Sequence, residues 1–157
     1  MLEDVNHADS NFQEVSGETL PASSILSLTG DQHLIGLHPG KTGLEARVAA
    51  AAVLPLNQLT CGQVRLLVGQ QIGLRWLAKP VAAFCAQHSQ AQCDIFPGDL
   101  TINALRAWET FLEYAPNETR KMISADLSWL VDDVAETSDG LFEEALQNLY
   151  AARAVIQ

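Results

Sequence analysis

The stretch from Leu54 to Leu100 constrains the fold of this 157-residue chain more than any other part of it. Apolar residues recur there at spacings of three and four, first after Leu59 and again after Gly73. Such spacing places apolar side chains on one side of a helix. The stretch therefore predicts two consecutive amphipathic helices at the centre of the fold, interrupted at Gly73.

Short-range signals predict where these helices begin and end. Thr60 stands three residues before Gln63, the spacing of a capping box, so the first helix is expected to open at Thr60. Pro80 supplies no backbone N–H and is expected to bend or restart the second helix. A Pro-Gly pair at 97–98 predicts a turn, after which the Asp99 carboxylate is expected to cap the next helix.

The rest of the chain also has helical periodicity, and no window alternates with the period of two that strands show. Thr42 and Glu45 have the spacing of a second capping box, and Asn117 is expected to cap a later helix. Further helices are expected over about 20–28, 44–53, 100–114, 118–134 and 140–156. The predicted class is all-α, with one domain over 19–157 built as a bundle of about six or seven helices.

Residues 1–18 are polar and acidic, with only scattered apolar side chains. They predict a mobile or loosely docked arm, and simple disorder of a chain terminus is the alternative.

The net charge narrows the choice of partner. Asp and Glu number 19 against 9 Lys and Arg, which gives a formal charge of -10. The excess sits at the two ends, because residues 21–116 carry six acids and six bases. Nucleic acid is a poor partner for such a chain, so no direct nucleic acid binding is expected.

Three features predict a cytoplasmic protein. The three cysteines form no regular disulfide framework. The chain begins with acidic residues where a signal peptide would be basic. No apolar run approaches the about 20 residues that a membrane span needs, so no membrane association is expected.

No metal, cofactor or catalytic site is expected. Cys85, His88 and Cys93 lie close together, but zinc sites usually use tight cysteine pairs, and no second pair follows. The histidines stand outside any nucleophile motif; they are His7, His33, His38 and His88. A hydrolase would need a carboxylate pair such as Asp132 and Asp133, but these adjacent residues point about 100° apart on a helix. The chain is therefore expected not to be an enzyme.

Several short motifs follow one another in the central stretch. They are Val64-Arg65-Leu66-Leu67, Gly69-Gln70-Gln71-Ile72-Gly73-Leu74, Leu77 with Pro80, and Phe96-Pro97-Gly98-Asp99-Leu100. In this order and spacing they resemble the central signature of contact-dependent growth inhibition (CDI) immunity proteins. The resemblance implies a cytoplasmic protein that binds and neutralises a toxin domain delivered by neighbouring bacteria.

The residues of this signature are interpreted as structural. They are Thr60, Arg65, Gln70, Gly73, Pro80, Pro97, Gly98 and Asp99. Arg65 is expected to pair with a carboxylate or a helix end. The alternative is that its polar members, Arg65, Gln70 and Asp99, contact a partner.

An acidic group near the C-terminus is the candidate partner-binding site. Its members are Asp132, Asp133, Glu136, Asp139, Glu143 and Glu144, and nothing basic lies between Lys121 and Arg153. Such a group suits a cationic toxin, with a nuclease as the expected class, although a solvated surface can carry as many charges. A helical adaptor or regulatory subunit for another basic protein is the alternative function.

Overall fold

The computed structural model describes residues 5–30, 43–136 and 140–157, and within them the chain is all-α, as predicted. These parts hold ten α-helices and one 3-10 helix, more than the six or seven expected. In chain order they are α1 (Phe12–Ser16), α2 (Ile25–Thr29), α4 (Gly43–Ala52), η2 (Leu56–Gln58), α5 (Cys61–Gly69), α6 (Leu74–Gln87), α7 (Asp99–Arg106), α8 (Trp108–Tyr114), α9 (Pro116–Ser124), α10 (Ser128–Glu136) and α11 (Gly140–Ile156).

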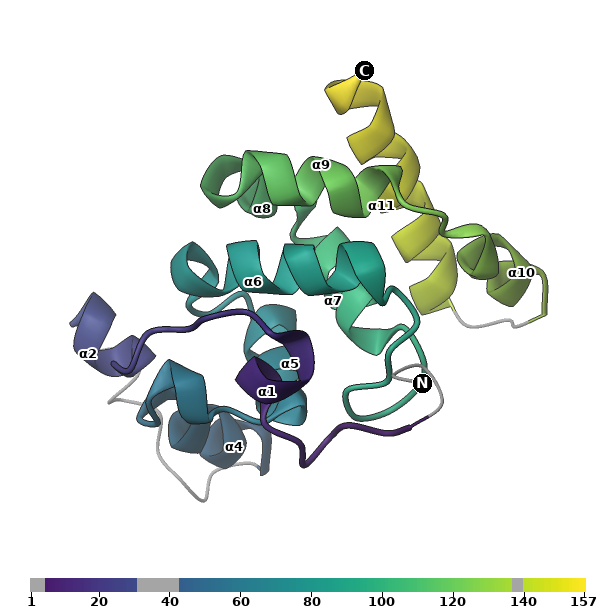
Figure 1. Cartoon of the computed structure of the whole chain (residues 1–157). Coiled ribbons are helices and arrows are strands. Elements are labelled where there is room, and N and C mark those ends of the chain that lie inside the picture. The colour runs from purple at the N-terminus through teal and green to yellow at the C-terminus, as the bar shows by residue number, and fades with distance from the viewer. Residues whose placement is uncertain (1–4, 31–42, 137–139) are drawn as a thin grey trace.

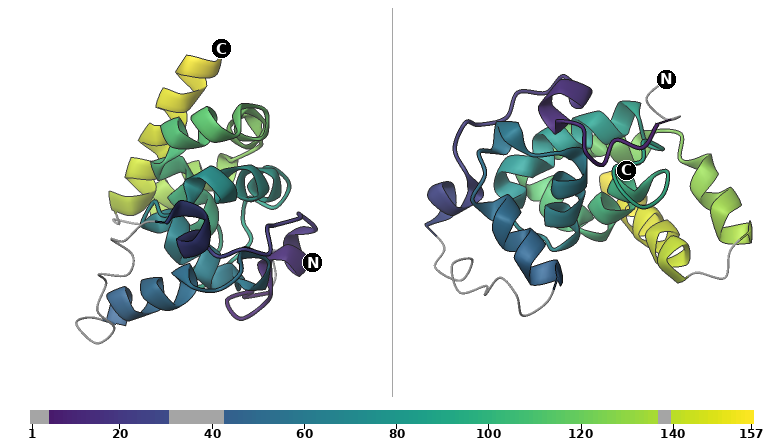
Figure 2. Two further views of the ribbon diagram at one scale, coloured as in Figure 1. Left: turned by 90° about the vertical axis from the view of Figure 1, so that its left-hand side faces the viewer. Right: turned by 90° about the horizontal axis from the view of Figure 1, so that it is seen from below.

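Helix α6 lies at the centre of a single domain. It packs most extensively against α9 and also contacts α8, α7 and α5. Figure 1 shows α9 on one side of α6 and α5 on the other, with α2 and α10 at opposite ends of the molecule. Helix α11 packs against α7, α9 and α10, and Figure 2 shows its C-terminal end projecting from the body.

The predicted start of the first central helix is confirmed. The Thr60 hydroxyl accepts the Gln63 N–H at 3.1 Å, and the Gln63 side chain accepts the Thr60 N–H at 3.0 Å. This capping box satisfies two N–H groups that the first turn of α5 leaves without helical partners. Helix α6, by contrast, runs through the buried Pro80 and does not restart there. Its contacts with α8 and α9 offset the one hydrogen bond that the proline removes.

The expectation of a loose arm over residues 1–18 is wrong for the described part, residues 5–18. Phe12 is fully buried and meets the Phe84 ring edge-on at a centroid distance of 5.5 Å. Backbone hydrogen bonds join Phe12 N–H to the Leu59 carbonyl at 2.9 Å and Cys61 N–H to the Ser10 carbonyl at 2.8 Å. The buried Phe12 ring and these hydrogen bonds therefore attach residues 5–18 to the rest of the domain, although the average composition of this segment is polar.

Several predicted helix boundaries are also wrong. The helix expected over 100–114 is divided at Ala107 into α7 and α8, and α9 ends before α10 begins at Ser128. Apolar spacing does not reveal these breaks, since both halves of each pair bury residues in the same core. Helix α2 begins after Ser24, whose hydroxyl accepts the Ser27 N–H at 3.0 Å. Helix α9 has no side-chain cap, so Asn117 does not cap it.

Candidate functional site

Asp99 is the centre of the signature, and its role differs from the one expected. Its side chain is 1% exposed. The carboxylate accepts the N–H groups of Cys93 and Asp94, each at 2.9 Å, and of Ile95 at 2.8 Å. Helix α7 has no side-chain cap. Asp99 therefore holds the loop that precedes its helix and does not cap the helix itself.

Arg65 links this loop to helix α5. Its Nε lies 3.4 Å from Asp99 Oδ2, and its Nη1 lies 3.6 Å from Asp94 Oδ2. Its backbone carbonyl accepts a hydrogen bond of 3.1 Å from Asn103 Nδ2 on α7. The predicted pairing of Arg65 with a carboxylate is thus present. A side chain that is 18% exposed and paired in this way serves the scaffold.

Helix α10 packs against the Pro-Gly turn at residues 97–98 through the Trp129 ring. Gly98 has a φ of +86°, and a Cβ atom there would lie 2.5 Å from the Trp129 ring. Trp129 Nε1 donates a 3.0 Å hydrogen bond to Ser89 Oγ. Glycine at 98 thus permits both the left-handed backbone and the seating of Trp129, while Pro97 stays exposed.

Two further signature residues, Gln70 and Gly73, lie between α5 and α6, and they differ in their surroundings. Gly73 precedes α6 with a φ of +73°, and a Cβ atom there would lie 2.5 Å from Ile25 Cδ1. Gly73 is therefore structural, because it allows α2 to approach α6. Gln70 is exposed, and only its backbone N–H has a hydrogen bond among the described residues.

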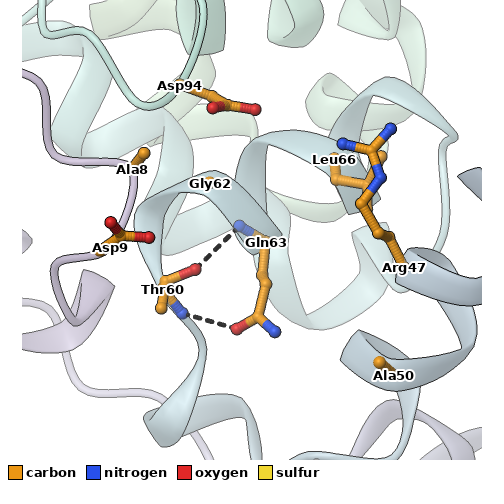
Figure 3. A pocket seen from close by; sticks show the side chains of 9 residues that line it. All are labelled: Ala8, Asp9, Arg47, Ala50, Thr60, Gly62, Gln63, Leu66 and Asp94. Atoms are coloured by element: carbon orange, nitrogen blue, oxygen red, sulfur yellow. Dashed lines mark hydrogen bonds between the residues drawn. The ribbon is translucent and has the colours of Figure 1, made fainter. Parts of the chain in front are cut away.

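A pocket of about 320 Å³ lies between the N-terminal segment, α4 and α5. It is lined by Ala8, Asp9, Arg47, Ala50, Thr60, Gly62, Gln63, Leu66 and Asp94. Figure 3 shows the two carboxylates on one side and Arg47 on the other, with Thr60 and Gln63 bonded to each other between them. The carboxylates and the guanidinium of this lining can bind a charged ligand. The Thr60 hydroxyl, by contrast, is already hydrogen-bonded in the cap of α5.

The three cysteines, Cys61, Cys85 and Cys93, are fully buried free thiols. Burial raises the pKa of Cys85 to about 12. A hydrogen bond with the Cys61 thiol, together with burial, raises the pKa of Cys93. Both thiols are therefore protonated at neutral pH, the form that neither attacks substrates nor binds metals. In the described parts of the chain no three His, Cys, Asp or Glu side chains are placed to hold a metal ion.

The acidic residues predicted to bind a partner lie on α10 and α11, which pack against each other. Asp132, Glu143 and Glu144 are exposed, and Asp133 is half-buried. We call these four residues the C-terminal acidic surface. Asp139 and the side chain of Glu136 lie outside the described part of the structure.

Two arginines near the C-terminal acidic surface, Arg106 and Arg153, each interact with other groups of the protein. Arg106 Nε lies 3.7 Å from Glu144 Oε1. Arg153 donates to the carbonyls of Ile123 at 3.0 Å and Ala125 at 3.1 Å, and so ties α11 to the end of α9. Among the described residues, Glu144 is the one member of the C-terminal acidic surface with an ion pair. The surface keeps a strong negative charge.

The structure also exposes apolar residues that sequence reasoning missed. Tyr150 is 55% exposed and Val155 is 64% exposed, both on α11. Phe142, Leu146 and Leu149 mark the inward face of this helix. The signal was present in the sequence, because Tyr150 and Val155 fall off the face that these three residues define.

Comparison with protein-family models, with curated proteins and with solved structures finds no match to this chain. Within the described residues, no helix is both long enough and apolar enough to cross a bilayer.

Proposed function

We propose that this chain is the immunity protein of a contact-dependent growth inhibition system. It binds the cognate toxin domain, neutralises it stoichiometrically and performs no turnover. The C-terminal acidic surface is the binding face, and the toxin is cationic, with a nuclease as the expected class. The signature in residues 64–100 supports the family, and the uncompensated charge on α10 and α11 supports the binding face.

The charge of the binding face serves association and specificity. An acidic surface attracts a basic cleft over several ångströms and raises the rate of encounter, most strongly at low ionic strength. Arg153 donates its hydrogen bonds to backbone carbonyls, and among the described residues it forms no ion pair with a carboxylate of this surface. Asp126 carries a further negative charge before α10, and hydrogen bonds from the Ser128 side chain and N–H hold its pKa below the ordinary value.

Helix α11 adds an apolar anchor to the same face. Glu143 and Tyr150 are seven residues apart, so they lie within about 20° of each other around the helix. Glu144 and Val155 are eleven residues apart and share a second line, about 100° around the helix from the first. All four side chains are exposed. Tyr150 lies about 10 Å further along the helix than Glu143, a distance that one partner surface spans. In such an interface an aromatic side chain supplies much of the affinity and charges supply specificity.

Co-purification tests the proposal. The chain, expressed with the polypeptide encoded beside it, should elute with a cationic toxin domain as a one-to-one complex. Its dissociation constant should rise as salt is added, because exposed charges are screened. A one-to-one complex with a basic protein that has no toxic activity would instead assign the chain to the adaptor class. Recovery of no cationic partner would contradict both functions.

A further inference from the structure

A second pocket, of about 340 Å³, lies between the turn that joins α5 to α6 and the end of α8. It is lined by Thr29, Gln71, Gly73, Leu74, Arg75, Trp76, Thr110 and Tyr114. We call it the α6 pocket. Three of its lining residues, Gln71, Gly73 and Leu74, belong to the signature, and none of them lies on the C-terminal acidic surface.

The lining of the α6 pocket combines a cation with two aromatic rings. The Arg75 guanidinium carbon lies 5.8 Å from the centre of the Trp76 ring. Trp76 is half-buried, and Tyr114 is 45% exposed. Tryptophan, tyrosine and arginine are the residues that most often carry the affinity of protein interfaces. Apolar walls beside an available guanidinium suit a ligand that carries a carboxylate next to an apolar group.

The backbone conformation of Gln71 also supports a binding role for the α6 pocket. It is the one non-glycine residue with a positive φ in the described parts of the chain, at +56°. Gly73, two residues later, adopts a similar conformation without the steric cost that a Cβ atom brings. The Gln71 side chain is exposed and has no hydrogen bond among the described residues. Strain of this kind is typical of ligand sites, and here it presents an amide at the edge of a pocket.

Charge identifies the partner. Residues 46–93 contain Arg47, Arg65, Arg75 and Lys79 and no acid, in a chain whose net charge is -10. Arg65 is paired, whereas exposed Arg75 forms no ion pair with any described residue. Lys79 follows Arg75 by one turn and is also exposed. A carboxylate is therefore the group whose charge this end of α6 complements.

We propose that the α6 pocket binds an acidic segment of a partner protein, with a carboxylate on Arg75 and an adjacent aromatic side chain between Trp76 and Tyr114. A segment of a protein fits better than a small metabolite, because the pocket is open to solvent, whereas small-molecule sites bury most of the surface of their ligand. Gln71 hydrogen-bonds the backbone of the segment.

The α6 pocket is separate from the C-terminal acidic surface. Helix α2, which contributes Thr29 to the pocket, and helix α10, which carries Asp132 and Asp133, lie at opposite ends of the molecule (Figure 1). Their charges are opposite as well. One chain can therefore hold a cationic toxin at one end and an acidic segment at the other, so the pocket does not depend on the proposed immunity function.

Nuclear magnetic resonance of the ¹⁵N-labelled full chain tests this inference. One probe is an acetylated, amidated peptide with the sequence Gly-Asp-Phe-Asp-Leu-Gly, and its matched control replaces both aspartates by asparagine. The acidic peptide should shift the Trp76 indole N–H and the amides of Gln71 and Arg75. We expect a dissociation constant on the order of 1 mM, since a short flexible peptide loses much of its affinity to ordering. The asparagine peptide should bind at least tenfold more weakly.

Two variants separate binding from folding. Arg75→Gln should abolish the shifts and leave the melting temperature unchanged, because Arg75 is exposed and unpaired with any described residue. Gln71→Gly should weaken binding at least threefold without lowering the melting temperature, because glycine relieves the left-handed backbone. Gln70→Ala is the matched control. Gln70 is exposed but does not line the pocket, so its loss should leave binding intact.

Three results would overturn the inference. The first is the absence of shifts at these signals at millimolar peptide, and the second is equal binding of the two peptides. The third is a set of shifts at the same signals that grows with protein concentration when no peptide is present. That last result would mean that the acidic end of a second copy occupies the pocket.

Discussion

Replacement of Asp99 by alanine is expected to lower the free energy of unfolding by about 3 kcal/mol or more. The substitution leaves three N–H groups of residues 93–95 without their acceptor. It also leaves the Arg65 guanidinium without its most buried counter-charge. A lost helix cap would cost only about 1 kcal/mol, so the size of the effect distinguishes the two roles. Urea denaturation followed by circular dichroism measures it.

Asp94→Ala is the matched control for this substitution. Asp94 also faces Arg65, at 3.6 Å, but its side chain is 37% exposed. Solvent screens a pair of this kind, and its loss is expected to cost no more than about 1 kcal/mol. If Asp99→Ala costs no more than Asp94→Ala, the buried carboxylate does not fasten the loop and the account of the signature is wrong.

Reversal of the C-terminal acidic surface is expected to weaken binding of the proposed toxin domain at least about 100-fold at low salt. The variant carries lysine at Asp132, Asp133, Glu143 and Glu144, which turns attraction into repulsion along the whole proposed face. The dependence of the association rate on salt should also fall, because steering by these charges is lost. Stopped-flow kinetics and calorimetry with the toxin domain measure both effects. The far-ultraviolet circular dichroism should remain that of the parent chain.

The control for this reversal changes the net charge by the same amount elsewhere. Asp9, Glu14, Glu109 and Glu113 serve for this control, because they are exposed and lie outside α10, α11 and the segment that joins α9 to α10. Their replacement by lysine should weaken binding less than about tenfold, since distant charges act only through the screened field of the whole protein. Equal losses in the two variants would show that net charge, and not this face, governs binding.

The features of the fold that the sequence predicted well depend on neighbours in the chain. Thr60 and Gln63 are three residues apart, so their capping box requires nothing beyond one helical turn. The apolar faces of α5 and α6 follow from spacing in the same way. Interactions between neighbours in the chain were therefore enough to predict the all-α class and the two central helices, α5 and α6.

The wrong predictions concern contacts between distant segments. Phe12 is anchored by Leu59 and Phe84, which composition around Phe12 does not reveal. The break at Ala107 keeps both neighbouring helices on the core and so leaves the apolar period unchanged.

The candidate site was predictable only in part. A run of acids without bases pointed to the end of the molecule where α10 and α11 meet. Tyr150 and Val155 lie off the apolar face of α11, but no motif in the sequence marks them as contact residues. Trp76 falls at helical spacing beside leucines, a pattern typical of core packing, whereas the structure leaves it half-buried beside Arg75. Aromatic residues at helical spacing do not distinguish a core position from the wall of an open pocket.

A titration of toxin activity against this chain tests the central claim most directly. The proposed toxin domain, taken from the polypeptide encoded beside the gene for the chain, is held at a concentration well above the dissociation constant, and its residual activity is measured as the chain is added. Stoichiometric inhibition predicts a linear fall that reaches zero at one chain per toxin domain. Full activity in the presence of excess chain, or complete inactivation by a small fraction of an equivalent, would contradict it.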